Sequence, residues 1–310
     1  MAERVCPAER IWDAGRPVDV RSTLAPLRRG AGDPAHRIDA DGSFWLAAAT
    51  PGGGGTLALR ALDTTRVLAR AWGDGGPWLL DRLPLLLGER DGCDWANLDL
   101  GGWPRLRDVL RRRPGMRLSA TGLVMDALVP AVLEQRVTGM EARRAWRGLL
   151  ARYGAPAPGP QVDLRVPPSA ATLLAVPSWE WHRLGVDGQR LRAVRAAATV
   201  ASRLEECVGL DDAAALARLR IVPGIGEWTA AETAQRALGH PDAVSVGDFH
   251  LADLVVGFFT GRPRGTDAEM LELLEPWRGQ RHRVVRLIEL SGVAKPRFGP
   301  RYAPLNTRAM

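Results

Sequence analysis

The stretch Leu219–Asp248, LRIVPGIGEWTAAETAQRALGHPDAVSVGD, decides how the rest of the chain is interpreted. Within it, Gly224 and Gly226 flank a single aliphatic residue, Ile225. Glycine lets the backbone turn without a Cβ clash, and successive main-chain N–H groups at such a turn suit a phosphate oxygen. The stretch therefore predicts a hairpin between two helices, the second from about Glu227 to Leu238, with Ile225 pointing inward between them.

One isolated carboxylate, Asp248, ends this stretch and directly precedes an apolar run from Leu251 to Phe259. An Asp in front of a helix commonly caps it, because its side chain accepts hydrogen bonds from the first main-chain N–H groups. Taken alone, Asp248 is best explained as such a cap. The hairpin before it adds a second interpretation, a carboxylate placed for chemistry.

Hairpin and carboxylate together resemble the helix-hairpin-helix, Gly-Pro-Asp superfamily of base-excision DNA glycosylases, and within it the DNA-3-methyladenine glycosylase II (AlkA) branch. That family carries Leu-x-x-x-Pro-Gly-Ile-Gly-x-Trp-Thr-Ala followed by a catalytic Asp. The matching positions here are Leu219, Pro223, Gly224, Ile225, Gly226, Trp228, Thr229, Ala230 and Asp248. The resemblance implies an enzyme that removes alkylated purines, of the 3-methyladenine and 7-methylguanine type, from damaged double-stranded DNA.

The rest of the chain shows two different patterns. Up to about residue 100, short apolar runs such as Phe44–Ala47 and Thr56–Leu59 alternate with Gly, Pro and Asp clusters. This predicts a small antiparallel sheet with a helix near Pro77–Leu87. From Trp103 onward the apolar residues keep helical spacing. We therefore predict an α+β protein with a small N-terminal β-rich domain (1–100), an all-α helix-hairpin-helix glycosylase domain (101–294) and a basic C-terminal tail (295–310).

Three stretches carry more specific expectations. Pro130 should kink its helix or start a new one, because proline lacks the N–H that the helix needs. The Pro/Gly-rich segment Ala155–Pro168 is expected to be a linker. The Arg-containing stretch from Arg21 to Gly30 fits either a DNA contact or a solvated surface loop.

A glycosylase must flip its target nucleotide into a pocket and fill the gap in the duplex with a side chain. By the resemblance, Asp248 supplies the carboxylate that stabilises a cationic sugar and orients the attacking water. Arg136, with Gln135 beside it, occupies the loop that supplies the filling side chain. Trp228 and Phe249 are expected in the base pocket.

Two pocket positions depart from the AlkA pattern, since Glu232 and Arg286 stand where that branch has aromatic residues. Glu232 would attract a cationic base, although both residues also fit an ion pair between neighbouring helices. Relatives that also cut the strand use a lysine for a Schiff base at the position of Trp228. The sole lysine of this chain, Lys295, lies in the tail, so a monofunctional hydrolase is expected.

The resemblance also assigns two roles to the hairpin. Its backbone is expected to hold a DNA phosphate through Gly224, Ile225, Gly226 and Thr229. A monovalent cation, Na⁺ or K⁺, is implied at the main-chain carbonyls of Arg220, Val222 and Ile225. No other cofactor is expected to be required.

Composition agrees with a polyanionic partner, because the formal net charge is +7. Three cysteines are too few for a disulfide framework or for the four-cysteine iron–sulfur cluster of some relatives. The five histidines show no metal-ligand spacing. No signal-like start or run of ~18 apolar residues is present. We expect a soluble, cytoplasmic monomer that associates with the nucleoid when bound to DNA.

Two other functions remain open at this stage. One is a glycosylase for other or bulkier purine adducts, an interpretation based on Glu232 and Arg286. The other is a non-catalytic damaged-DNA-binding protein that keeps the hairpin but has lost the pocket. Such a protein would have no need of Asp248.

Overall fold

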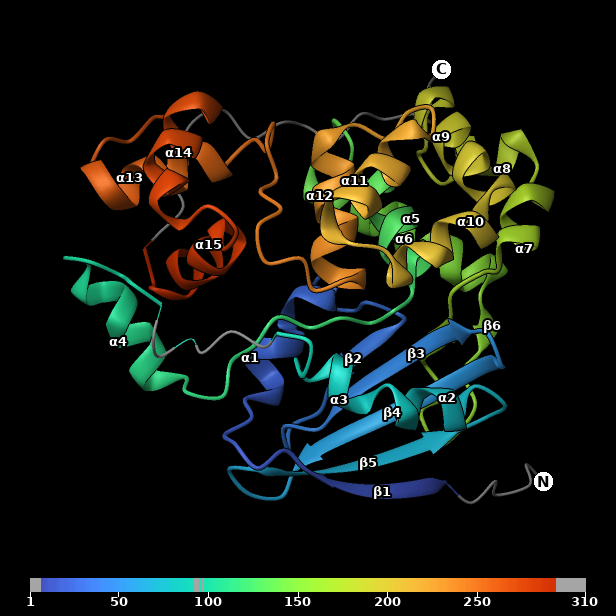
Figure 1. Ribbon diagram of the computed structural model, residues 1–310. Helices are drawn as coiled ribbons and strands as arrows, with labels where there is room; N and C mark the ends of the chain where they lie inside the picture. The colour runs from blue at the N-terminus through green and yellow to red at the C-terminus, as the bar shows by residue number, and fades with distance from the viewer. Residues whose placement is uncertain (1–6, 92–94, 96–97, 294–310) are drawn as a thin grey trace.

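The computed structural model describes residues 7–91, 95 and 98–293. Its N-terminal part is a five-stranded antiparallel sheet (Figure 1). Its strands pair in the order β1-β5-β4-β3-β2. Their bounds are Ala8–Asp13 (β1), His36–Ile38 (β2), Phe44–Thr50 (β3), Gly53–Ala61 (β4) and Arg66–Trp72 (β5). The antiparallel sheet predicted from the apolar runs is therefore confirmed.

Both faces of this sheet are covered. Phe44, Leu46 and Ala48 of β3 pack towards α1 (Val20–Leu24), α2 (Gly76–Asp81) and α3 (Leu83–Leu86). Because successive strand residues point to opposite faces, Trp45 lies on the other side, stacked on Trp72 with 5.4 Å between ring centroids.

The segment expected to be a linker covers that second face. It forms a small hairpin of β6 (Ala155–Pro156) and β7 (Arg165–Val166). Leu164 and Val166 pack against the two tryptophans in one buried cluster. The linker expectation was therefore wrong, because the apolar residues scattered between its prolines and glycines have a sheet face to bury.

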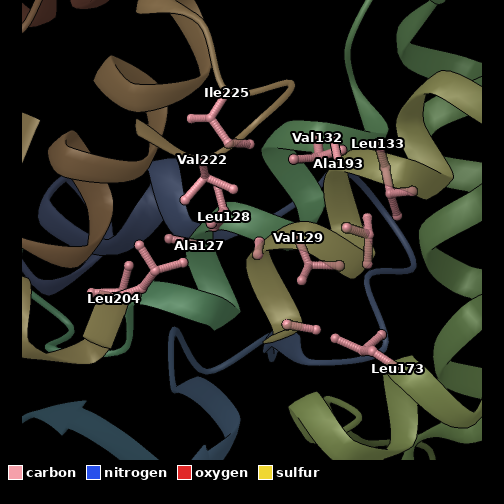
Figure 2. Packing of buried hydrophobic residues seen from close by; sticks show 14 of the residues in the cluster. Ala127, Leu128, Val129, Val132, Leu133, Leu173, Ala193, Leu204, Val222 and Ile225 are labelled. Carbon is pink, nitrogen blue, oxygen red and sulfur yellow. The ribbon is translucent and has the colours of Figure 1, made fainter. Parts of the chain in front are cut away.

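A bundle of helices follows, packed around one apolar core. Its helices are α5 (Val124–Leu133), α6 (Gly139–Tyr153), α7 (Ala170–Ala175), α8 (Ser178–Arg183), α9 (Gly188–Thr199), α10 (Ala201–Glu205), α11 (Asp212–Ile221) and α12 (Glu227–Ala237). Figure 2 shows side chains of this core, where Leu128 and Val132 of α5 lie near Val222 and Ile225 of the hairpin. Helix α5 continues through Pro130 rather than restarting there.

A third core joins distant parts of the chain. Helix α4 (Pro104–Arg112) packs with α13 (Leu251–Thr260), α14 (Asp267–Leu274) and α15 (Arg281–Leu290), as Figure 1 shows for α4 and α15. The apolar spacing predicts helices at about Asp267–Glu275 and Arg278–Leu290, and α14 and α15 agree with these bounds to within three residues. None of the described helices is both long and apolar enough to cross a bilayer. The predicted basic tail, with Lys295, lies outside the described residues.

Sheet and helices meet at a half-buried carboxylate. Asp126 of α5 accepts a hydrogen bond from the main-chain N–H of Ala49 in β3, at 3.3 Å. The pKa of Asp126 is raised to about 7, mainly by burial and also by the nearby Glu205 carboxylate, while the hydrogen bond from the Ala49 N–H acts to lower it. Since the folded-state pKa is higher than the unfolded one, ionisation of Asp126 destabilises the fold as the pH rises from about 4 to 7.

We predict that Asp126→Asn stabilises the protein at pH 8, because Asn keeps an acceptor for the Ala49 N–H without a buried charge. The gain in unfolding free energy should be about 2–4 kcal/mol at pH 8 and less than about 1 kcal/mol at pH 4.5. Urea unfolding at both pH values measures it. Asp81→Asn, at an exposed position on α2, is the control and should show no such difference. Equal stability of Asp126→Asn and the natural protein at pH 8 would contradict the prediction.

Candidate active site

The predicted hairpin is present between α11 and α12. Asp211 caps α11 by accepting from the N–H of Ala214 at 2.8 Å, and the turn closes when the N–H of Ile225 donates to the Val222 carbonyl at 3.0 Å. Gly224 has φ +87°, and a Cβ there would lie 2.7 Å from the Ala193 Cβ. Only glycine fits this position without displacing α9.

Gly226, the second glycine of the hairpin, is not required by a close contact. Gly226 stands at the N-cap of α12 with φ −87°, has no side-chain cap, and has open space where a Cβ would be. The first N–H groups of α12 therefore start at an uncovered surface, which suits a phosphate. Ile225 is 4% exposed and joins the helical core, so its predicted inward position is confirmed (Figure 2).

The loop between α5 and α6 is tied to this hairpin. The Nε2 of Gln135 donates to the Gly224 carbonyl at 2.9 Å and to the Thr229 Oγ1 at 2.8 Å. Thr229 is 2% exposed, and its side chain serves this internal contact. Gln135 likewise links the loop to the hairpin, so its side chain is not free beside the gap-filling residue expected at Arg136.

The next residue, Arg136, is exposed and strained. Its φ of +54° is the only positive φ of a non-glycine residue in the part of the chain that the structure describes. The residues before it are fixed one by one. Arg190 donates to the Leu133 carbonyl at 2.9 Å, Arg29 donates to Glu134 at 2.8 Å, and Gln135 binds the hairpin. The loop thus presents Arg136 to solvent in a set conformation.

Asp248 both caps a helix and faces a cavity. Its Oδ1 accepts from the N–H groups of His250 at 2.8 Å and Leu251 at 2.9 Å, at the start of α13. Its Oδ2 accepts from the Trp228 Nε1 at 3.3 Å. The geometry is compatible with both interpretations of Asp248, the helix cap and the carboxylate placed for chemistry. The cap fixes one oxygen, and the carboxylate lines the cavity.

The cavity, of about 460 Å³, lies where the three cores meet. The segment around α1 contributes one wall, α12 a second, and α15 a third. Its lining residues include Thr23, Arg28, Arg117, Ser119, Arg143, Glu232, Arg236, Asp248, His282, Arg286 and Glu289. The structure thus brings Asp248, Glu232 and Arg286 together, as predicted for a base pocket.

Glu232 and Arg286 are each paired within their own helix, and not with each other. Glu232 accepts from the Ser245 Oγ at 2.6 Å and pairs with Arg236 at 2.8 Å. Burial acts to raise the pKa of Glu232, but Arg236, Arg29 and the Ser245 hydroxyl together outweigh it and hold the pKa below its ordinary value. Arg286 pairs with Glu289. The charge of Glu232 is therefore largely compensated, which weakens the expected attraction for a cationic base.

The two aromatic residues predicted for the pocket do not line the cavity. Trp228 lies beside it, held to Asp248 through its indole N–H. Phe249 is 76% exposed and packs edge-on against the His250 ring, with 4.8 Å between centroids. The sequence prediction fails for Phe249 because the cap at Asp248 turns the next residues outwards before α13 begins.

Several lining residues were not predicted from the sequence, among them Ser119, Arg28 and His282. His282 is one of the five histidines without metal-ligand spacing, and Arg28 lies in a stretch with two open interpretations. These three do not belong to the hairpin motif, and each comes from a different segment. The sequence provides an indication for Arg28 alone, because a DNA contact is one of the two interpretations of the stretch Arg21–Gly30.

We compared the chain with known proteins by sequence. No protein-family model matches the chain. Its sequence is 34% identical over 157 residues to the probable bifunctional transcriptional activator/DNA repair enzyme AlkA of Mycobacterium tuberculosis, a match that covers 49% of this chain. The same match covers 31% of that protein, so the chain spans about a third of the length of the curated relatives it matches.

Solved structures match over more of the chain. The 3-methyladenine DNA glycosylase of Archaeoglobus fulgidus has a TM-score of 0.73 at 15% identity, covering 92% of this chain and 99% of that one. The 8-oxoguanine glycosylase/lyase of Clostridium acetobutylicum has a TM-score of 0.70 at 10% identity, covering 93% and 99%. A Schizosaccharomyces pombe 3-methyladenine DNA glycosylase bound to abasic DNA has a TM-score of 0.52 at 18% identity, covering 64% and 95%.

The class of protein follows from these likenesses together with the site. The chain has the fold of the helix-hairpin-helix DNA glycosylases, with an N-terminal antiparallel sheet before the helical part. The predicted resemblance to this superfamily, and within it to the AlkA branch, is confirmed.

We predict that Arg136→Gly is more stable than Arg136→Ala by about 1 kcal/mol, because both remove the side chain but only glycine relieves the left-handed backbone. Urea unfolding of the two variants measures the difference. At Arg144, an exposed position in helix α6, the order should reverse, with the alanine variant more stable by about 0.5–1 kcal/mol. A more stable alanine variant at both positions would show that Arg136 is not strained.

Proposed function

We propose that the protein is a monofunctional DNA glycosylase of base-excision repair that flips alkylated purines out of duplex DNA and hydrolyses the N-glycosidic bond. The observation that carries this proposal is the position of Asp248. Its carboxylate is fixed by two main-chain N–H groups and lines a cavity of about 460 Å³ directly behind the hairpin helix. A protein that only bound DNA could use the carboxylate as a helix cap, but it would not need one that also lines a cavity.

The chemistry needs one carboxylate. Breaking the C1′–N bond leaves positive charge on the sugar, and the ionised Asp248 stabilises that charge in the transition state. The same carboxylate orients the attacking water and accepts its proton. The Trp228 indole N–H, 3.3 Å from Oδ2, holds the carboxylate in place.

Binding of the duplex rests on the hairpin and the loop facing it. The uncapped start of α12 at Gly226 offers main-chain N–H groups to a phosphate, and the net charge of +7 favours a polyanion. Arg136, exposed and held in a set conformation next to the hairpin, is the side chain proposed to fill the gap left by the flipped nucleotide.

No strand-cutting step is proposed. Trp228 stands where a Schiff-base lysine would be, and an indole cannot form that adduct. Lys295, the sole lysine of the sequence, lies outside the described residues. The reaction is therefore written as hydrolysis with water as the nucleophile.

A monovalent cation fits the hairpin. Carbonyl oxygens at the end of a helix carry partial negative charge, and those of Arg220 and Val222 belong to the end of α11. The Val222 carbonyl accepts one hydrogen bond, from Ile225, and keeps a second lone pair. With the Ile225 carbonyl these groups would hold the ion, which would supply attraction for a phosphate.

A second candidate substrate class is a purine with another, or a bulkier, adduct. The specific observation in its favour is the lining of the cavity, which is polar and charged where the AlkA pattern is aromatic. This candidate changes the base in the cavity but leaves the roles of Asp248, the hairpin and Arg136 unchanged.

We predict that Asp248→Asn lowers base release by at least about 100-fold while duplex binding is retained, because Asn keeps the cap on α13 but not the charge. Single-turnover release of free base from duplexes with 7-methylguanine, 1,N6-ethenoadenine or hypoxanthine measures it. Binding is followed by fluorescence anisotropy. Retained duplex binding without release of any of these bases by the natural protein would instead identify a damaged-DNA-binding protein.

A further inference from the structure

The cavity carries an excess of positive charge. Five guanidinium groups line it against three carboxylates, namely Arg28, Arg117, Arg143, Arg236 and Arg286 against Glu232, Asp248 and Glu289. Two of the carboxylates are already paired, Glu232 with Arg236 and Glu289 with Arg286. Within the described residues, no carboxylate pairs with Arg28 or Arg117.

The histidine in the lining does not change this balance. Burial lowers the pKa of His282 well below 6.5, and the neighbouring Arg286 and Arg236 lower it further. His282 is therefore neutral at physiological pH. Among the described residues that line the cavity, it is also the only one with an aromatic ring, since Trp228 and Phe249 lie outside. The electron-rich faces of Trp or Tyr that attract a cation are thus missing.

The lining also contains polar atoms without partners. The Nδ1 of His282, the Oγ of Ser119 and the Nε of Arg28 are buried and have no hydrogen-bond partner among the described residues. These three atoms are closed to solvent, so the hydrogen bonds that the cavity offers come from accessible polar groups of the lining such as the guanidinium groups.

We propose that this cavity selects purine lesions that are neutral and offer hydrogen-bonding atoms, in preference to cationic N-alkylpurines. The inference rests on the proposed function and specifies its substrate class. The neutral alkylation adduct 1,N6-ethenoadenine and the deaminated purine hypoxanthine are of this class, whereas 7-methylguanine is of the cationic one.

The physical reason lies in the charge of the leaving group. The C1′–N bond breaks with its electron pair going to the base, while the oxygen of water bonds to C1′ and the proton of that water passes through Asp248 to solvent. A cationic base leaves as a neutral molecule and gains nothing from guanidinium groups. A neutral base leaves as an anion, until it takes a proton from solvent, and unpaired Arg28 and Arg117 stabilise that developing charge.

The same charges act on the ground state. A cationic base entering the cavity would meet like charges at short distance in a partly enclosed site, where electrostatic interactions are stronger than in water. The cavity therefore disfavours cationic bases, which leave the sugar most readily without an enzyme. It favours neutral bases, whose spontaneous loss is slower.

The test is single-turnover excision from matched duplexes containing 1,N6-ethenoadenine, hypoxanthine or 7-methylguanine, each rate divided by the spontaneous loss of that base. We expect the acceleration to be at least about 10-fold larger for the neutral bases. Arg28→Gln should reduce release of the neutral bases by about 10-fold or more and change 7-methylguanine release by less than about 3-fold. Arg192→Gln, at an exposed position on α9 away from the cavity, is the matched control and should change neither.

The outcomes separate the two proposals. Acceleration greatest for 7-methylguanine, with the ratio unchanged in Arg28→Gln, overturns the selectivity and leaves the glycosylase standing. Neutral selectivity that survives Arg28→Gln shows that the guanidinium is not responsible and overturns the stated cause. Release of no base, with duplex binding retained, removes the proposed function itself. Arg117→Gln carries the same test if Arg28→Gln does not fold, as judged by circular dichroism.

Discussion

The ion pair between Arg236 and Glu232 is the contact on which the geometry of the site depends. Both side chains are mostly buried, and the pair spans one turn of α12. Arg236 also donates to the Pro26 carbonyl at 3.0 Å, while Glu232 accepts from Ser245 at 2.6 Å in the loop that leads to Asp248. Removing one partner of a buried pair typically costs about 3–5 kcal/mol, because the other charge stays behind. One pair thus holds the N-terminal segment, the hairpin helix and the loop that leads to Asp248 together.

The strained loop at Arg136 is likewise held by contacts from several parts of the fold. A left-handed arginine costs about 1–2 kcal/mol, and such strain persists only where the surroundings over-determine it. Here the three preceding residues are each fixed by a different part of the fold, by α9, by the N-terminal segment and by the hairpin. The contact of Gln135 with the Gly224 carbonyl also joins this loop to the surface proposed to hold the phosphate. The residue proposed to fill the gap and the surface proposed to bind the DNA backbone are therefore held by the same contacts.

Local features of the sequence were enough to predict the hairpin, the inward position of Ile225 and the antiparallel sheet, because turn chemistry and periodicity depend on neighbouring residues. The contacts that complete the site join residues far apart. Gln135 reaches Gly224, 89 positions away, and Arg236 reaches Pro26 across 210. Periodicity shows which face of a helix is buried but not what covers it. For this reason the sequence could not show that Phe249 turns outwards, nor that Arg28 reaches the cavity.

The use of arginine connects these observations. A guanidinium offers five donors in a fixed plane, so one side chain can join carbonyls and carboxylates from several segments, as Arg190 does with Asp187 and the Leu133 and Gly185 carbonyls. A net positive chain can therefore bury much of its cationic charge as scaffold and leave less of it to attract DNA. Two of the remaining arginines belong to the proposals made above. Arg136 is exposed beside the hairpin and is the side chain proposed to fill the gap in the duplex. Arg28 lines the cavity, and the proposed selectivity depends on its charge being available to a leaving base on which negative charge develops.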